Sequence, residues 1–186
     1  MCGRFFFSEN IALDKYHRIL KRKYDQTTLN LWKTGEVFPN DIVVVIDNRN
    51  NPQLMKWSFN LFSRKIINSR IESIKEKAYY HEFIQKYRCL IPVSGFYEWN
   101  ANKEKHYIHT NEEMFYLDGI YQTTDALSNF SIITKPATQT SSIHNRCPII
   151  FNENQARSYL KEFNIMDLLT NNPILEIETS QKQLEL

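Results

Sequence analysis

Glycine and proline are scarce in this chain, with only 4 Gly and 6 Pro among 186 residues. No stretch rich in Pro or Gly divides the sequence, and no internal repeat is present. Such stretches commonly mark the linkers between domains. We therefore expect one domain over residues 1–186, long enough to bury most of its apolar surface.

Cysteine is also rare, and the 3 cysteines at Cys2, Cys89 and Cys147 have no metal-ligand spacing. No apolar run approaches the ~18 residues that a membrane-spanning helix needs, and the first residues do not resemble a signal peptide. An odd number of cysteines without a leader argues against a disulfide framework. We expect a reduced, cytoplasmic protein that holds no metal ion and does not enter a membrane.

Neither sign of charge dominates, because 23 Lys and Arg stand against 21 Asp and Glu, a formal net charge of +2. This mild excess neither requires nor excludes a nucleic-acid partner, since binding depends on a local basic patch. Hydrophobic residues make up 42% of the chain, which is ordinary for a globular protein and predicts a packed core.

Short apolar segments separated by turn residues predict many strands and few helices. Strands are expected at Cys2–Phe7, Ile42–Ile46, Leu54–Phe59, Cys89–Val93, Phe96–Trp99, Tyr107–His109, Met114–Tyr121, Asn129–Thr134 and Ile174–Thr179. Helices are expected at Ser73–Tyr87, at Glu153–Phe163, and after Ser8 with a buried side formed by Ala12, Tyr16, Ile19 and Leu20. This pattern predicts the α+β class, with a curved or barrel-like mixed β-sheet and a few flanking helices.

The chain begins Met1-Cys2-Gly3-Arg4, so removal of the initiator methionine would leave Cys2 as the amino terminus. An α-amine has a pKa near 7.7–8.0, so roughly 10% of it is neutral and nucleophilic at pH 7. Together with the thiol it forms a 1,2-aminothiol, which closes a five-membered thiazolidine ring on an aldehyde. On position alone, Cys2 is better explained as a small apolar residue at the start of a buried strand.

Three further segments place polar residues among apolar ones. In Ile67–Glu72, alternation puts Asn68, Arg70 and Glu72 on one side of an extended segment. Glu98 stands between two aromatic residues, and His144 stands in a loop rich in Ser and Thr. Each of these residues taken alone is explained as well by loop capping, a surface ion pair or a solvent-facing strand position.

Taken together, the sequences MCGRF, INSRIE, CLIPVSGFYEW and IHNRCP resemble the SRAP family, the SOS-response-associated peptidase-like proteins. The resemblance runs from Cys2 to about Phe163 and leaves residues 171–186 as a C-terminal tail. It implies a single SRAP-like domain and a covalent sensor of abasic sites in single-stranded DNA, active in the DNA damage response.

The resemblance also implies roles for four catalytic residues. The Cys2 amine would condense with the sugar aldehyde to an imine, and the Cys2 thiol would then close a thiazolidine crosslink. Glu98 would be the general acid/base, and an aromatic pocket would raise its pKa toward neutrality. His144 would move protons at the sugar hydroxyl, and Asn68 would hold the sugar or the amino-terminal residue.

Contacts with DNA are expected from phosphate binding and from stacking. The resemblance implies that Arg4, Arg70 and Arg146 grip phosphates, each able to do so through two N–H groups. Trp57 and Pro39 would wedge or stack against bases beside the lesion. The expected partner is single-stranded DNA containing abasic sites. The protein would need no cofactor, would act as a monomer, and would associate with the nucleoid when bound to DNA.

The sequence departs from the family at several positions. Many relatives have Asn-Val-Ala-Pro where this chain has Glu36-Val37-Phe38-Pro39, and Cys147 replaces a usual Met. Two other functions remain open. Cys2 with His144 as base could form a thiol peptidase, and the same pocket could read modified DNA bases without covalent chemistry. Aldehyde capture is preferred because it alone explains a nucleophile placed at the terminus.

Overall fold

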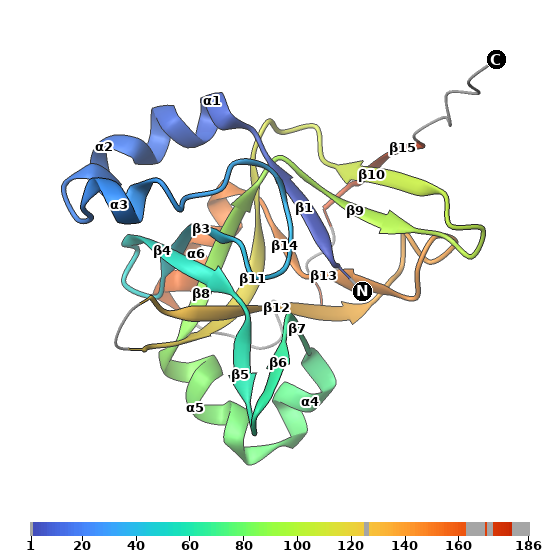
Figure 1. Cartoon of the computed structure of the whole chain (residues 1–186). Helices are drawn as coiled ribbons and strands as arrows, with labels where there is room; N and C mark the ends of the chain where they lie inside the picture. The colour runs from blue at the N-terminus through green and yellow to red at the C-terminus, as the bar shows by residue number, and fades with distance from the viewer. Residues whose placement is uncertain (1, 125–126, 163–169, 171–172, 180–186) are drawn as a thin grey trace.

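The computed structural model describes residues 2–124, 127–162, 170 and 173–179. Two large β-sheets share a hydrophobic cluster, and helices flank the larger sheet (Figure 1). A separate two-stranded hairpin is formed by β5 (Phe59–Leu61) and β6 (Arg64–Ile66). The α+β class predicted from the sequence is confirmed.

The smaller sheet contains five antiparallel strands in the order β15-β10-β9-β1-β2. These strands are β15 (Glu176–Thr179), β10 (Lys105–His109), β9 (Gly95–Trp99), β1 (Arg4–Phe7) and β2 (Gly35–Val37). Strand β9 passes close to β10 at Gly95, where a Cβ atom would collide with the ring of Tyr107. The absence of a side chain at Gly95 therefore permits this pairing.

The larger sheet has the order β13-β12-β4-β3-β8-β11-β14, with β7 paired to β12. Pairing between β11 and β12 closes β12, β4, β3, β8 and β11 into a ring, as the barrel-like prediction requires. Strand β12 runs parallel to β4 and β7, so the sheet is mixed. The bounds are β3 (Ile42–Asp47), β4 (Pro52–Trp57), β7 (Asn68–Arg70), β8 (Arg88–Val93), β11 (Phe115–Gln122), β12 (Asn129–Pro136), β13 (Arg146–Pro148) and β14 (Ile150–Phe151).

The first helical segment contains a π-helical turn. Helices α1 (Glu9–Ala12) and α2 (Arg18–Lys21) flank the π-helix η1 (Leu13–His17). Ala12, Tyr16 and Leu20 are buried as predicted, but Ile19 is 43% exposed. A π-helical turn contains more residues than an α-helical turn. The buried residues of this segment are therefore four apart, at Ala12, Tyr16 and Leu20, and Ile19 lies on the exposed side.

The helix predicted over Ser73–Tyr87 is two helices, α4 (Ile71–Glu76) and α5 (Ala78–Lys86), separated by an extended Lys77. Ile74 and Tyr80 are both buried. In one continuous helix, residues six apart would point in different directions, and the break allows both to face the core. Two further helices among the described residues are α3 (Gln26–Leu29) and α6 (Glu153–Lys161), and α6 begins with an Asn152–Gln155 capping box.

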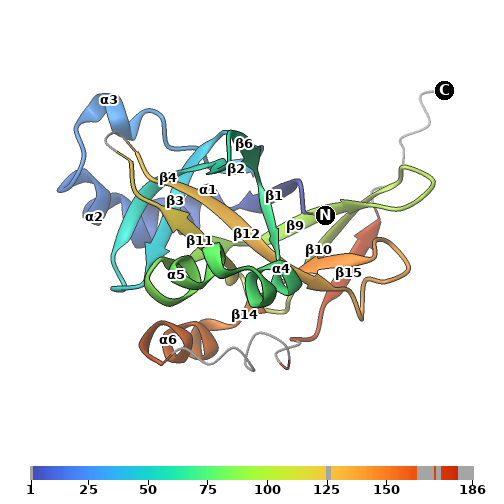
Figure 2. The ribbon, with the colours of Figure 1, turned by 90° about the horizontal axis from the view of Figure 1, so that it is seen from below.

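Alternate side chains of the central strands enter two different hydrophobic clusters. Along β3, Val44 and Ile46 pack with the helices, whereas Val43 and Val45 join the cluster shared with the smaller sheet. Figure 2 shows β1, β9 and β10 on one side of the molecule and α2, α5 and α6 on the other. Within the described ranges, no helix has the length and apolarity needed to cross a bilayer.

Candidate active site

The beginning of the chain lies beside Glu98 because of the register between β1 and β9. Arg4 pairs with Tyr97 in this antiparallel arrangement. Counting one residue back along β1 and one forward along β9, Gly3 comes opposite Glu98. Cys2 is completely buried in the cluster shared by the two large sheets. The fold therefore brings the predicted nucleophile and the predicted acid/base residue together.

Asn68 holds the backbone of Cys2. Its side-chain Nδ2 donates a hydrogen bond to the Cys2 carbonyl oxygen at 2.7 Å. Asn68 begins β7, whose parallel pairing with β12 sets it opposite Ile132. Asn68, in the larger sheet, thus fixes the position of Cys2, which directly precedes the first strand of the smaller sheet.

Glu98 is 3% exposed, and burial raises the pKa of its carboxyl from 4.5 to about 7. The positive charge of the amino terminus acts in the opposite direction. A carboxyl group with a pKa near 7 is present in both protonation states at neutral pH. It can therefore both donate and accept a proton, as a general acid/base must.

The thiol of Cys2 is kept in its neutral form. Burial raises the pKa of this thiol well above its ordinary value, and the negative charge of Glu98 raises it further. The thiol donates a weak hydrogen bond to the Arg4 carbonyl oxygen, with Sγ 3.8 Å from that atom. Because the thiolate is the reactive form, the Cys2 thiol needs a proton acceptor during any reaction.

His144 lies in the turn before β13 and is half-buried. Its Nδ1 accepts a hydrogen bond from the Arg146 backbone N–H at 3.0 Å, which leaves the ring proton on Nε2 in the neutral imidazole. Burial lowers the pKa of His144, and the charge of the amino terminus lowers it further. The imidazole is therefore neutral near pH 7 and is electrostatically coupled to the chain start.

Cys147 is a member of this group that the sequence did not indicate as functional. It is buried in β13, and burial raises the pKa of its thiol to about 11. The charge of Glu98 contributes to this shift, and Cys147 in turn raises the pKa of Cys2. Position 147 precedes a proline in an apolar run, and no local pattern marks it as a neighbour of Cys2.

Arg146, for which the resemblance implies a phosphate contact, binds protein groups in this structure. Its guanidinium forms two hydrogen bonds to Glu72, at 2.7 and 3.0 Å, and a third to the Thr134 carbonyl oxygen at 2.6 Å. The residue is only 9% exposed. These contacts tie α4 to β12 and β13, and the phosphate contact of Arg146 stays a prediction.

Trp57, which was predicted to stack against DNA bases, is completely buried in this structure. Its ring is stacked at 7° on Phe130, with centroids 6.3 Å apart, and lies 5.1 Å from the ring of Phe5. Its Nε1 donates to the Ile67 carbonyl oxygen at 2.9 Å. A base cannot reach this ring, and Trp57 serves as a core residue beneath the site.

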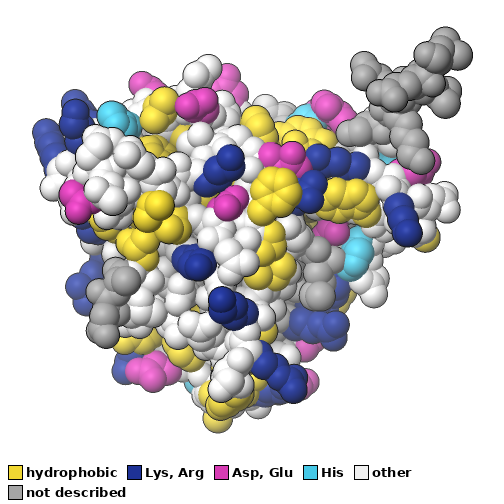
Figure 3. All heavy atoms as spheres, in the orientation of Figure 1, with side chains coloured by type: hydrophobic (Ala, Val, Ile, Leu, Met, Phe, Trp, Pro, Cys, Tyr) yellow, Lys and Arg dark blue, Asp and Glu magenta, His cyan; other side chains and the backbone are white. Residues whose placement is uncertain are grey.

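Three predicted DNA-contact residues reach the surface. Arg70 is exposed at the end of β7, and Pro39 is half-buried in a turn beside Phe38, which is 41% exposed. Arg4 is partly exposed, and its guanidinium lies over the Phe38 ring at 4.2 Å. Figure 3 shows basic, acidic and hydrophobic side chains side by side on the face that carries β1 and β9.

The sequence model of the SOS response associated peptidase (SRAP) family matches residues 1–184. The chain belongs to the SRAP family. Among its curated relatives, abasic site processing protein YobE of Bacillus subtilis is 27% identical to this SRAP chain, over 88% of the chain and 84% of YobE. Abasic site processing protein YoqW of Bacillus phage SPbeta is 28% identical, over 88% of the chain and 82% of YoqW.

Solved structures share the fold of this SRAP chain at lower sequence identity. A protein from Bacteroides thetaiotaomicron superposes with a TM-score of 0.75 at 22% identity, covering 97% of this chain and 93% of its own. A phage-related protein from Bordetella bronchiseptica gives a TM-score of 0.73 at 20% identity, covering 97% and 95%. The SRAP resemblance read from the sequence is confirmed.

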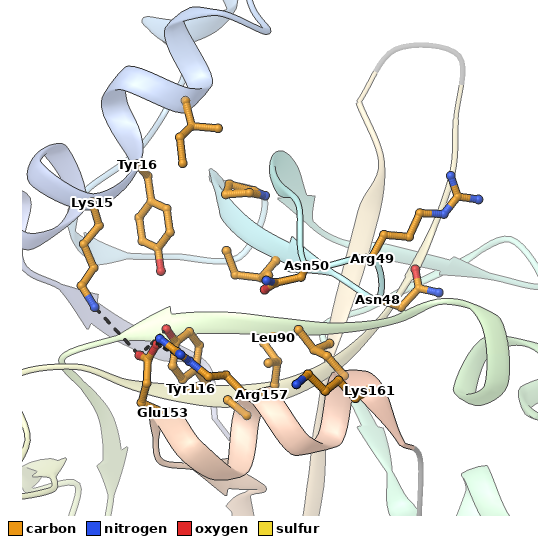
Figure 4. Close-up of a pocket in the computed structure, with 15 residues that line it drawn as sticks. Lys15, Tyr16, Asn48, Arg49, Asn50, Leu90, Tyr116, Glu153, Arg157 and Lys161 are labelled. Atoms are coloured by element: carbon orange, nitrogen blue, oxygen red, sulfur yellow. Dashed lines mark hydrogen bonds and ion pairs between the residues drawn. The ribbon is translucent and has the colours of Figure 1, made fainter.

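A cavity of about 770 Å³ lies away from the candidate active site, between η1, the turn joining β3 to β4, and α6 (Figure 4). Lys15, Tyr116 and Arg157 converge on Glu153 at one end of it. These contacts already satisfy Glu153, the one carboxylate among the described residues that line the cavity. In the part of this SRAP chain that the structure describes, no group of three or more His, Cys, Asp or Glu could hold a metal ion.

Proposed function

We propose that this SRAP protein captures abasic sites in single-stranded DNA covalently, through the amine and thiol of Cys2 after removal of Met1. The observation that carries the proposal is the contact of Asn68 with the Cys2 carbonyl oxygen at 2.7 Å, next to a buried Glu98 whose pKa is about 7. Relatives that match 88% of the chain are named abasic site processing proteins, which supports the same substrate.

The chemistry needs only groups that the chain supplies. An abasic deoxyribose opens to an aldehyde, and the Cys2 amine adds to its C1′ carbon. Loss of one water molecule gives an imine. The thiol sulfur then adds to the imine carbon, its proton goes to the nitrogen, and the thiazolidine ring is closed.

Each neighbouring residue has a role in these steps. Glu98 protonates the departing hydroxyl group and then transfers the proton of the Cys2 thiol to the imine nitrogen; burial and the Glu98 charge raise the pKa of that thiol. Asn68 fixes the backbone of Cys2 so that its amine and thiol face one carbon atom. His144, neutral and bearing its proton on Nε2, relays protons at the sugar hydroxyl.

The raised pKa of the Cys2 thiol also counts against a thiol peptidase. Such an enzyme needs a thiolate, which a neighbouring cationic histidine would favour. Here burial disfavours the thiolate, and His144 has a lowered pKa that keeps its imidazole neutral. Aldehyde capture begins instead at the amine, so a neutral thiol does not prevent the first step.

A denaturing gel with abasic and with intact single-stranded DNA tests the proposal. Wild type should give a shifted band with abasic DNA alone, and its mass should equal the chain without Met1 plus the DNA minus one water. Cys2→Ala should give no stable adduct while still binding DNA. A variant with a retained residue before Cys2 should be equally inactive. No adduct from wild type, even under reductive capture, would identify a non-covalent reader instead.

A further inference from the structure

One oxygen of Glu36 binds two cations on the surface of the smaller sheet. Arg4 Nη1 lies 3.2 Å from Glu36 Oε1, and Lys105 Nζ lies 2.7 Å from the same atom. The side chains of Arg4 and Lys105 are each 30% exposed, and that of Glu36 is 33% exposed. All three are therefore within reach of a ligand at the surface, yet partly shielded from water.

The strand register places this group on one face. Arg4 of β1 pairs with Tyr97 of β9, and Lys105 of β10 pairs with Trp99 of the same strand. The Arg4 guanidinium lies 4.2 Å from the Phe38 ring and 5.0 Å from the Trp99 ring. Lys105 Nζ lies 3.9 Å from the Tyr97 ring. We call these five residues, together with Glu36, the Arg4 cluster: two cations, three aromatic rings and one carboxylate.

Glu36 cancels half of the positive charge in the Arg4 cluster. Partial burial acts to raise the pKa of its carboxyl, but the hydrogen bonds and charges of Lys105 and Arg4 lower that pKa overall. Glu36 is therefore an anion at neutral pH, and it occupies a guanidinium donor of Arg4. Arg4 stands only two residues after Cys2, where the DNA backbone must pass in the proposed function.

We propose that Glu36 competes with DNA phosphate for Arg4 and so weakens the non-covalent binding of DNA. This inference rests on the proposed function, because it takes single-stranded DNA as the ligand of this face. A phosphate that approaches Arg4 must displace or share the Glu36 contact. DNA without an aldehyde is then released readily, whereas abasic DNA is retained by its covalent bond. Selectivity arises from the difference between these two outcomes.

The size of the effect follows from counterion release. For single strands, the logarithm of the binding constant falls with the logarithm of salt concentration by about 0.7 for each phosphate contacted. Removing the Glu36 charge should add about one such contact. Glu36→Gln is therefore expected to steepen the salt slope by about 0.7 and to tighten binding about fivefold at ~0.1 M salt.

Fluorescence anisotropy with a labelled, intact oligothymidylate measures this directly. All variants carry Cys2→Ala, so covalent capture cannot contribute, and thermal unfolding checks that each variant is folded. Glu36→Gln should bind more tightly with a steeper salt slope. Glu113→Gln makes the same change of charge at an exposed position between β10 and β11, and should change neither quantity. Adding Arg4→Ala to Glu36→Gln should remove the gain.

Three outcomes would overturn the inference. They are unchanged or weaker binding by folded Glu36→Gln, an equal gain from Glu113→Gln, and a gain that persists without Arg4. The second outcome would show a general effect of net charge, and the third would show that Glu36 acts elsewhere. The proposed function fails separately, by the absence of an adduct in the denaturing gel, so the two results are distinguishable.

Discussion

Replacing Glu98 by glutamine should change the pH dependence of stability in a definite direction. Burial raises the pKa of Glu98 from 4.5 to about 7 in the folded chain, while the unfolded chain keeps the ordinary value. Between these two pH values the folded protein holds a proton that the unfolded chain has lost. The free energy of unfolding of wild type therefore falls as pH rises through this window.

The magnitude follows from the size of the shift. One pKa unit corresponds to about 1.4 kcal/mol, so the ionised Glu98 lowers stability by about 3 kcal/mol above pH 7 relative to pH 4. Glutamine has nearly the same shape and no charge to bury. Between pH 4 and pH 8, the free energy of unfolding of Glu98→Gln should therefore rise by about 3 kcal/mol relative to that of wild type. The free energy of unfolding of a typical protein is about 5–15 kcal/mol in total.

Urea unfolding of both proteins across this pH range, followed by tryptophan fluorescence, measures the difference. Asp118 is also completely buried, with a pKa raised by burial to about 8, and it lowers stability at high pH in both proteins. Subtracting the two curves of unfolding free energy against pH cancels the effect of Asp118 and leaves the contribution of Glu98. Parallel curves from pH 4 to pH 8 would show that Glu98 does not titrate in this window and would refute the reasoning.

Two further predictions separate core residues from surface residues. Trp57→Ala should lower the free energy of unfolding by about 3–5 kcal/mol, because the Trp57 ring is fully buried. A decrease of less than about 1 kcal/mol in urea unfolding would contradict the assignment of Trp57 to the core. Arg70→Ala should flatten the salt slope of single-stranded DNA binding by about 0.7 with little change in stability. Arg146→Ala should instead destabilise the protein, because it removes the hydrogen bonds that join Glu72 and the Thr134 carbonyl oxygen to β13. Anisotropy and urea unfolding of both arginine variants check this contrast, and equal salt slopes would contradict it.

Local patterns in the sequence determined the main elements and the family. The β-branched run Ile42–Ile46 predicted β3, and its alternation explains why one strand serves two hydrophobic clusters. The short motifs around Cys2, Asn68, Glu98 and His144 indicated the SRAP family, which the match over residues 1–184 confirms. The prediction of a single domain over the whole chain stays a prediction.

Local sequence could not decide features that depend on residues distant in the chain. Strands β2 and β13 are only three residues long and are defined by their pairing with β1 and β12, not by their own composition. The π-turn that exposes Ile19 depends likewise on how the helix packs against the sheet.

The chemistry of each predicted site residue was decided by the same long-range packing. Arg4 and Arg146 are equally basic in the sequence, yet one reaches the surface and the other is used by Glu72 and Thr134. Trp57 is as aromatic as Trp99, but it lies at the centre of the core. The sequence by itself determined which chemical groups the protein has and which family it belongs to. Only tertiary structure decided which of those groups are accessible and charged, because burial and pairing depend on residues far apart in the chain.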